Sequence, residues 1–315
     1  MTSAEIADLD TGFQEVVPVC DKHREEIRNY PNVVGVGVSL KLVKFEVTSI
    51  PCIVVFVREK VRDLKRSDGE IVPADFGGVP TDIVESGSPL LRVYDGRIRP
   101  ARPGYSVGHT SISKGTLGCM VLDLDSETEM VLSNNHVLAN SNNASQGDPI
   151  VQPGPDDGGN HPADTIAELA RFKPIVAGQN KIDAAVATPT EADLVEPAIP
   201  GGIGIPSGVH QIDSVGEYVQ KVGRSSQHTS GIVTAYDASI YPLHYPGIGD
   251  VEFVESIVTT GMSQGGDSGS LLLDMDKKGV GLLFAGMSRD DQEIVTYYNG
   301  VRNVLDILKV TLVTA

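Results

Sequence analysis

The stretch GMSQGGDSGS in the C-terminal part of the sequence contains a serine that is surrounded by glycines. Ser268 follows Asp267, and Gly265, Gly266 and Gly269 lie within three residues of it. A serine nucleophile needs a general base, a group that orients the base, and hydrogen-bond donors for the developing oxyanion. Glycines let successive backbone N–H groups point at one spot, so we expect the amides of Gly266 and Ser268 to form that oxyanion site. By itself, GDSG also fits an ordinary turn.

A base and an orienting acid precede this serine in the chain. Of the seven histidines, only His136, in MVLSNNHVLAN, directly follows an apolar strand pattern and precedes another apolar pair. Asp183, in NKIDAAVATP, begins an apolar run, as expected of an acid that works buried against an imidazole. Each residue alone also fits a structural role, as a partly buried histidine or a strand-end aspartate. Together, the order His136, Asp183, Ser268 within one predicted β region indicates nucleophilic acyl transfer.

The elements that must position these side chains are short strands. From Gly104 onward, strand patterns such as GTLGCMVLDL, EMVLSN, YVQKVGR and SGSLLLDM recur roughly every 8–12 residues, separated by Gly, Asn and Asp. Such spacing favours an all-β sandwich or a pair of barrels. We place the barrels at about 104–200 and 201–300, and GVRNVLDILKV predicts a short C-terminal helix over 301–310.

The first part of the chain has a different pattern. We expect residues 1–98 to form a small helical and α+β domain with a linker, ahead of a second domain over 99–315. Apolar residues recur at helical spacing until Pro18 interrupts them, and a second, charged helix is predicted to follow. NVVGVGVSLKLV and PCIVVFVREK are strand-like, and the second is continuously apolar, which is typical of a central strand. The Pro- and Arg-rich stretch LLRVYDGRIRPARPG predicts the linker.

Three blocks, LSNNHVL, IDAAVA and GGDSGSLLL, resemble the catalytic blocks of bacterial trypsin-like (chymotrypsin-fold) serine peptidases, which have plant relatives of the Narrow leaf type. The segments PNVVGVGVSLK, GDPIVQPGPDDGG and KVGRSSQHTSGIVTA extend the similarity over nearly the whole chain. The resemblance implies a mainly β fold with two packed six-stranded barrels and a triad in the cleft between them. It also implies that Ser268 attacks a carbonyl, that His136 transfers the proton and that Asp183 fixes the imidazole.

The sequence departs from secreted trypsins in ways that bear on activation and specificity. No Ile-Val-Gly-Gly-like segment heads the barrel region, so Asp267 must find a donor other than a new N-terminus. Six residues before the nucleophile, where an acid would select basic side chains, stands Met262. The resemblance places the pocket wall at Phe284, Ala285 and Gly286, so we expect an apolar or small side chain at the cleaved bond. Met262 also fits a plain core position.

The composition of the chain limits the classes of partner that the protein is expected to bind. A formal net charge of −17 argues against nucleic acid and anionic membranes, because phosphate groups would be repelled. Three widely spaced cysteines predict buried, reduced thiols. The acidic N-terminus lacks a signal-peptide pattern, and no apolar run approaches the roughly 20 residues of a membrane span, so the expected location is the cytoplasm. GPDDGGNHPAD matches no metal-ligand spacing, and we expect no metal or cofactor.

Two hypotheses remain after these observations. The first is an intracellular serine endopeptidase that acts on protein or peptide substrates and is regulated by its N-terminal domain. An exposed strand edge in that domain could also make it a homo-oligomer. The second is a latent or inactive protein of the same fold that binds or scaffolds. The presence of all three triad residues favours the first.

Overall fold

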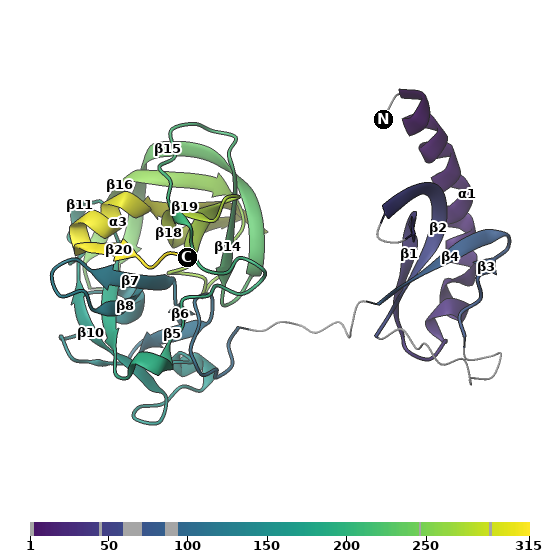
Figure 1. Ribbon diagram of the computed structural model, residues 1–315. Helices are drawn as coiled ribbons and strands as arrows, with labels where there is room; N and C mark the ends of the chain where they lie inside the picture. Colours follow the sequence, from purple (N-terminus) through teal and green to yellow (C-terminus); the bar gives the residue numbers. More distant parts are fainter. Residues whose placement is uncertain (1–2, 44–45, 59–70, 86–93, 246, 290–291) are drawn as a thin grey trace. The chain divides into compact units, whose positions relative to one another are not determined.

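The structure, a computed structural model, describes residues 3–43, 46–58, 71–85, 94–245, 247–289 and 292–315 (Figure 1). The chain divides into two compact units, residues 1–91 and 92–315. Within the predicted linker, residues up to 93 lie outside the described part of the chain.

The first unit is a long helix packed on a four-stranded sheet of order β1-β2-β4-β3. Its elements are α1 (Ser3–Arg28), β1 (Val33–Val43), β2 (Glu46–Val57), β3 (Asp75–Phe76) and β4 (Val79–Glu85). β1 and β2 are antiparallel, whereas β2 and β4 are parallel. Val16, Cys20 and Ile27 of α1 are buried in one hydrophobic cluster with Ile53 and Val55 of β2. The continuously apolar β2 is therefore a central strand, as its composition predicts.

The predicted break at Pro18 is wrong, because α1 continues through the proline as one helix. A proline inside a helix removes one backbone hydrogen bond and crowds the preceding turn, at a cost of about 3 kcal/mol. Val16 and Cys20 lie on either side of Pro18, and both are buried in the same cluster. Packing on both sides of the proline outweighs its local cost.

The first barrel of the second unit is a closed ring of six strands. Its strands are β5 (Ser106–His109), β6 (Gly115–Thr116), β7 (Cys119–Asp123), β8 (Glu129–Ser133), β9 (Pro149–Val151), β10 (Thr165–Phe172) and β12 (Ala185–Pro189). The short helices α2 (Asn135–Leu138) and η2 (Pro155–Asp157) lie between them, and η3 (Ala192–Leu194) follows β12. The strands pair in the order β7-β8-β12-β10-β9-β5-β6. The ring closes because only Leu117 and Gly118 separate β6 from β7, so the two behave as one interrupted strand.

The second barrel is also a ring of six strands. They are β14 (Tyr218–Gly223), β15 (Gln227–Tyr245), β16 (Gly249–Thr260), β17 (Leu271–Asp274), β18 (Lys278–Arg289) and β19 (Gln292–Gly300). The pairing β16-β15-β14-β17-β18 is closed by β19, which bonds to both β16 and β18. The predicted pair of six-stranded barrels is thus confirmed. Two short strands are added at its edges, β11 (Gly178–Asn180) beside β16 and β13 (Gly208–Val209) beside β18.

The end of the chain crosses from the second barrel back to the first. The predicted C-terminal helix is present as α3 (Val301–Leu308), but it ends earlier than expected. Lys309 has a φ of 52°, a left-handed conformation that terminates a helix. The chain then forms β20 (Val310–Leu312), which pairs with β7 of the first barrel.

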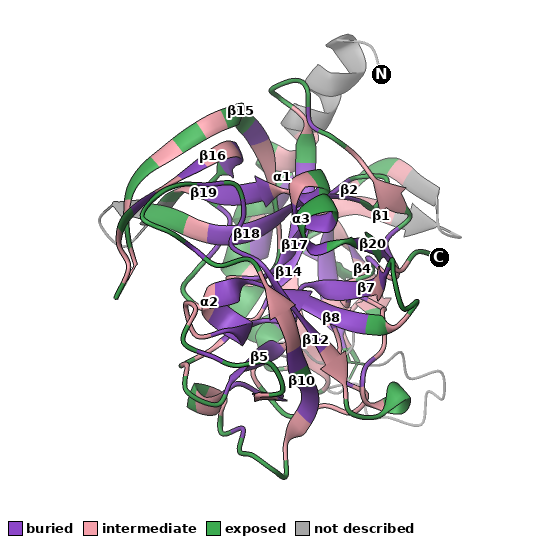
Figure 2. Ribbon diagram, turned by 90° about the vertical axis from the view of Figure 1, so that its left-hand side faces the viewer, coloured by how far each residue is buried: buried purple, intermediate pink, exposed green. Residues whose placement is uncertain are grey.

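Burial follows the barrel geometry. Figure 2 shows β8 almost entirely buried, whereas β15 alternates between exposed and intermediate positions along its length. The buried aliphatic side chains form separate clusters, of which one contains Leu132 of β8, Leu271 of β17 and Val304 of α3. That cluster includes residues of both barrels and the C-terminal helix, so the barrels share part of their core.

Candidate active site

The pairing of β8 with β12 brings His136 to Asp183. Ala185 lies opposite Ser133 in the antiparallel register, so the segment that follows β8 meets the segment that precedes β12. His136 Nδ1 lies 2.5 Å from Asp183 Oδ2, and the His136 amide donates to Asp183 Oδ1 at 3.1 Å. The carboxylate is therefore held by two groups of the same residue.

A third donor to this carboxylate comes from the second barrel. The Tyr245 hydroxyl, at the end of β15, donates to Asp183 Oδ2 at 2.7 Å. Burial by itself would raise the pKa of Asp183, because solvent does not reach the carboxylate. The charge of the His136 ring and the hydrogen bonds from His136 and Tyr245 outweigh burial and hold that pKa below its ordinary value. Asp183 is thus an ionised acid inside the protein.

Two buried asparagines fix the backbone of Asp183. Asn134 Nδ2 donates to the Asp183 carbonyl at 2.7 Å, and the Asp183 amide donates to Asn299 Oδ1 at 2.8 Å. Asn134 directly precedes the helical turn that carries His136, and Asn299 belongs to β19 of the second barrel. The position of the acid therefore depends on both barrels.

Residues 261–270, here called the serine loop, form a tight turn ahead of Ser268. Asp267 N donates to the Gln264 carbonyl at 2.9 Å, and Gly266, third in this turn, has a φ of 103°. A positive φ at that position is the type II arrangement, which glycine favours. Ser225 Oγ donates to the Gly265 carbonyl at 2.7 Å. The Gly265 carbonyl and the Gly266 N–H belong to one peptide group, and in a trans peptide these two point in opposite directions. Because the carbonyl points toward Ser225, the Gly266 N–H points away from it.

The amides predicted to bind an oxyanion have no partner among the described residues. Neither Gly266 N nor Ser268 N donates a hydrogen bond there, while the neighbouring Gly269 N donates to the Leu283 carbonyl at 2.9 Å. The backbone of Gly269 lies against β8, since a Cβ on Gly269 would stand 2.0 Å from Ser133 Oγ. The loop thus lies beside the strand that leads to His136.

The Ser268 hydroxyl is not bonded to His136 among the described residues, since no hydrogen bond joins Ser268 Oγ to the His136 ring there. Catalytic hydrogen bonds are often long or poorly aligned without substrate. The structure therefore links His136 to Asp183 by a hydrogen bond. Ser268 is placed near them only by the packing of its loop against β8.

Asp267 has a buried cation as its partner. Lys221 Nζ, on β14, lies 3.1 Å from Asp267 Oδ2, and both side chains are inaccessible to solvent. Ser226 Oγ also bonds to Oδ2, at 2.5 Å, and the Ser225 amide donates to Oδ1 at 2.7 Å. Burial would raise the pKa of Asp267, but the Lys221 charge and these hydrogen bonds keep it below its ordinary value. The sequence alone does not identify this partner.

The predicted pocket residues separate into two groups. Met262 is buried in the core of the second barrel with Val219 and Val233, the environment expected of a plain core residue. Phe284 is buried in a different cluster, against which Ala285 packs, while Gly286 is exposed. The structure therefore gives Met262 a packing role and leaves the strand at Phe284 to Gly286 as the remaining pocket candidate.

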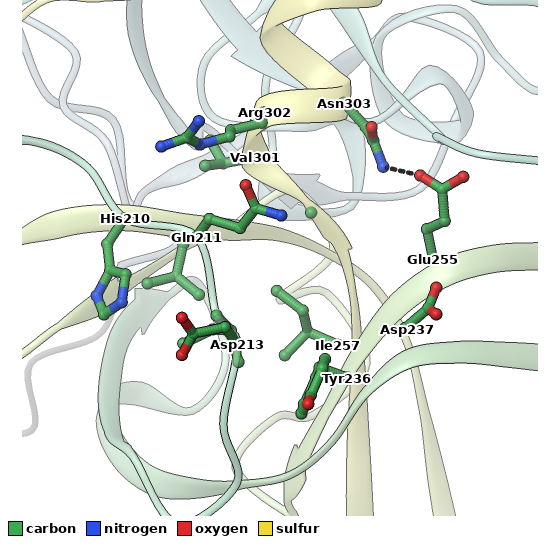
Figure 3. Close-up of a pocket in the computed structure, with 13 residues that line it drawn as sticks. His210, Gln211, Asp213, Tyr236, Asp237, Glu255, Ile257, Val301, Arg302 and Asn303 are labelled. Atoms are coloured by element: carbon green, nitrogen blue, oxygen red, sulfur yellow. Dashed lines mark hydrogen bonds between the residues drawn. The ribbon is translucent and has the colours of Figure 1, made fainter.

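A cavity of about 350 Å³ lies on the second barrel, away from these residues (Figure 3). It is lined by residues 210–213 and by side chains from β15, β16 and the start of α3, with Glu255 accepting a hydrogen bond from Asn303 at 3.0 Å. None of His136, Asp183 and Ser268 lines it. The described residues contain no group of side chains arranged to hold a metal ion. None of the described helices is long and apolar enough to cross a bilayer.

Six contributors to the site were not predicted from the sequence, namely Lys221, Ser225, Ser226, Tyr245, Asn134 and Asn299. A lysine in the middle of the apolar strand pattern YVQKVGR is a signal for a buried ion pair. The two asparagines before His136 could have indicated buried backbone partners. Tyr245 carries no local signal, because its contact depends on how a long hairpin folds over the first barrel.

The fold is similar to that of solved bacterial proteases. Against Thermobifida fusca Protease A the chain is 17% identical with a TM-score of 0.50, covering 68% of this chain and 98% of that one. Against the Nocardiopsis protease NAPase the values are 16% and 0.50, covering 67% and 98%. No protein family model matches the sequence, and no curated protein sequence shows significant similarity to it. The fold is that of the bacterial chymotrypsin-like serine proteases, as predicted, while the relation to plant Narrow leaf proteins stays a prediction.

Proposed function

We propose that the protein is a serine endopeptidase in which His136, Asp183 and Ser268 form the triad. The observation that carries the proposal is the buried, ionised Asp183 bonded to His136 Nδ1. This contact leaves Nε2 free to act as the base, because the acid fixes which ring nitrogen bears the proton. The backbone amides of Gly266 and Ser268, which have no partner among the described residues, support the same function, because an oxyanion needs such hydrogen-bond donors.

In this mechanism, Ser268 Oγ attacks the scissile carbonyl while His136 takes the hydroxyl proton. The amides of Gly266 and Ser268 donate to the oxyanion of the tetrahedral intermediate. His136 then protonates the leaving amine, the C–N bond breaks and an acyl-enzyme remains. Water, deprotonated by His136, hydrolyses the ester and restores Ser268.

We further infer that activity does not require cleavage of the chain ahead of the barrels. In this proposal the Lys221 ammonium holds Asp267, and through it the serine loop, in the working shape. Support comes from the 3.1 Å contact between the two buried groups and from the positive φ of Gly266. A cation built into the fold is present as soon as the chain folds.

The proposal retains a protein or peptide substrate with an apolar or small side chain at the cleaved bond, because the expected pocket wall, Phe284 and Ala285, consists of apolar side chains that belong to or pack against a hydrophobic cluster. It also retains a cytoplasmic location, in keeping with three buried free cysteines. Self-association through the N-terminal unit remains part of the hypothesis. The edge strand β1, which pairs only with β2 among the described strands, supports it.

Labelling with a fluorophosphonate probe tests the proposal. We expect the wild type to label, and Ser268→Ala and His136→Ala to lose labelling and about 10⁴-fold or more of peptidase activity. Circular dichroism would show that both variants fold. A folded wild type that neither labels nor cleaves peptides would favour the scaffold alternative. The lack of a hydrogen bond between Ser268 and His136 among the described residues is the observation on which that alternative rests.

A further inference from the structure

The carboxylate of Asp183 is shared between two side chains from different barrels. Oδ2 lies 2.5 Å from His136 Nδ1 and accepts the Tyr245 hydroxyl at 2.7 Å. The two donors compete for the negative charge on one oxygen. Among the described residues, His136 and Tyr245 are the titratable groups that contact this carboxylate. Asn134 and Asn299 bind only the backbone of Asp183.

Tyr245 is held in place by its own packing. Its ring centre lies 5.9 Å from that of Phe253 and 6.3 Å from that of His136, edge-on to the imidazole. Leu243 and Ile248, on either side of it in the β15–β16 hairpin, pack against the same cluster as Tyr245. The hydroxyl can therefore reach Asp183 only while the end of the hairpin is docked.

The phenol stays a donor over the whole working pH range. Burial, the Asp183 charge and the hydrogen bond to Asp183 raise the pKa of Tyr245 well above 10. A donor to a carboxylate stabilises the negative charge there, so less of that charge acts on the proton of the imidazole. Without the phenol oxygen, more of the negative charge of Asp183 should act on the proton of the His136 ring.

We propose that Tyr245 is a positioning residue of the active site. It fixes Asp183 Oδ2 and limits the negative charge that His136 faces, and it makes docking of the β15–β16 hairpin a condition for full activity. The effect on rate rests on the proposed function. The effect on the titration of the His136 ring does not, because it requires only the folded protein.

The test is an NMR titration of the His136 ring in the wild type, Tyr245→Phe and Tyr241→Phe, with the resonance assigned by its loss in His136→Gln. Tyr241 is the matched control, since it lies on the same strand and is 71% exposed. We expect the titration midpoint to rise by about half a pH unit in Tyr245→Phe, the size expected for one lost hydrogen bond. Tyr241→Phe should match the wild type.

Two further measurements separate the proposals. If the protein is an active peptidase, the acidic limb of its kcat/KM profile should move to higher pH by the same amount in Tyr245→Phe, and fluorophosphonate labelling should slow about threefold. If no variant labels while the ring titration still shifts, the proposed function fails, and only the effect of Tyr245 on the charge that His136 faces stands.

Site-specific 3-fluorotyrosine at position 245 gives a variant that keeps the hydroxyl. Because fluorine makes the phenol a stronger donor, the His136 midpoint should fall. This variant also covers the case in which Tyr245→Phe does not fold. A midpoint that is unchanged or lower in Tyr245→Phe, or unchanged or higher with 3-fluorotyrosine, would overturn the proposal.

Discussion

Asp267 is a carboxylate that solvent does not reach and on which five donors converge. Lys221 Nζ, Ser226 Oγ and the Gln264 amide contact Oδ2, and the amides of Ser225 and Ser226 contact Oδ1. Removing charges from water is costly, and only good geometry with additional hydrogen bonds offsets that cost. The arrangement meets this condition. It links the residue next to Ser268 to β14 of the barrel wall.

Replacing Lys221 should therefore damage both stability and the serine loop. In Lys221→Met, the Asp267 charge is left buried without its cation. We expect a loss of about 3–5 kcal/mol in unfolding free energy, measured by urea denaturation, together with loss of fluorophosphonate labelling. Lys278→Met, at an exposed position on β18, is the control and should stay near the wild type. Equal stability of the two variants would contradict the role given to the ion pair.

Asp183 should make stability depend on acid pH. Its folded-state pKa lies below its ordinary value, so its carboxylate favours the folded state above about pH 4. That contribution is lost as the pH falls through the folded-state pKa. Urea unfolding between pH 2 and pH 7 should show a shallower acid-side decline in Asp183→Asn than in the wild type. Identical slopes would mean that Asp183 is not held ionised by its neighbours.

At the scale of elements, the serine loop and the strands β6 and β8 approach so closely that side chains cannot fit between them. A Cβ on Gly269 would stand 2.0 Å from Ser133 Oγ and 2.4 Å from the Thr116 carbonyl, and Gly269 has a φ of 95°. By contrast, a Cβ on Gly265 would meet nothing within 4 Å. Close packing and a positive φ therefore require glycine at position 269, whereas position 265 has space for a side chain.

Gly269→Ala and Gly265→Ala form a matched pair that tests this contrast. We expect Gly269→Ala to lower the unfolding free energy by about 3 kcal/mol or more, because it adds both backbone strain and a clash with backbone. Gly265→Ala should stay within about 0.5 kcal/mol of the wild type. Thermal and urea denaturation measure both. A tolerated alanine at Gly269 would show that the loop can move away from β6 and β8.

At the scale of the whole molecule, the two barrels of residues 92–315 are joined by the C-terminal segment as well as by the candidate site. Arg171 of β10 donates to the Leu308 carbonyl through Nε at 3.0 Å and Nη2 at 2.6 Å, and its Nη2 lies 2.5 Å from Asp123 Oδ2. One first-barrel side chain thereby satisfies the C-terminal end of α3. With β20 on β7, it attaches the end of the second barrel to the first.

Arg171→Met should loosen this attachment. The variant leaves the Leu308 carbonyl without its donor and Asp123 without its cation, so we expect a loss of about 2 kcal/mol in unfolding free energy. Arg302→Met, at an exposed position of α3, serves as the control and should change stability by less than about 0.5 kcal/mol. Urea denaturation measures both variants. A loss of equal size in the two variants would mean that Arg171 contributes nothing specific.

Local patterns predicted much of this architecture. The recurring short apolar runs indicated an all-β sandwich or a pair of barrels, and the resemblance to chymotrypsin-fold peptidases specified six strands in each. The apolar face of the last segment indicated α3, because the periodicity of burial depends on neighbouring residues. The break at Pro18 was predicted wrongly because the proline signal is local, while the packing of Val16 and Cys20 on the sheet is not. Residues 178–180 lie within the range of about 104–200 expected for the first barrel, yet they form β11, which pairs with β16 of the second barrel.

The sequence by itself determined the barrel fold and singled out His136, Asp183 and Ser268 as candidates, because residue type and order along the chain constrain chemistry. Only the tertiary structure decided what surrounds them. Lys221 of β14 contacts Asp267 in the loop before the neighbouring strand β17, and Tyr245 contacts Asp183 from a hairpin 62 residues further along the chain. Such contacts arise from strand pairing and barrel closure, which bring together residues that no local pattern connects.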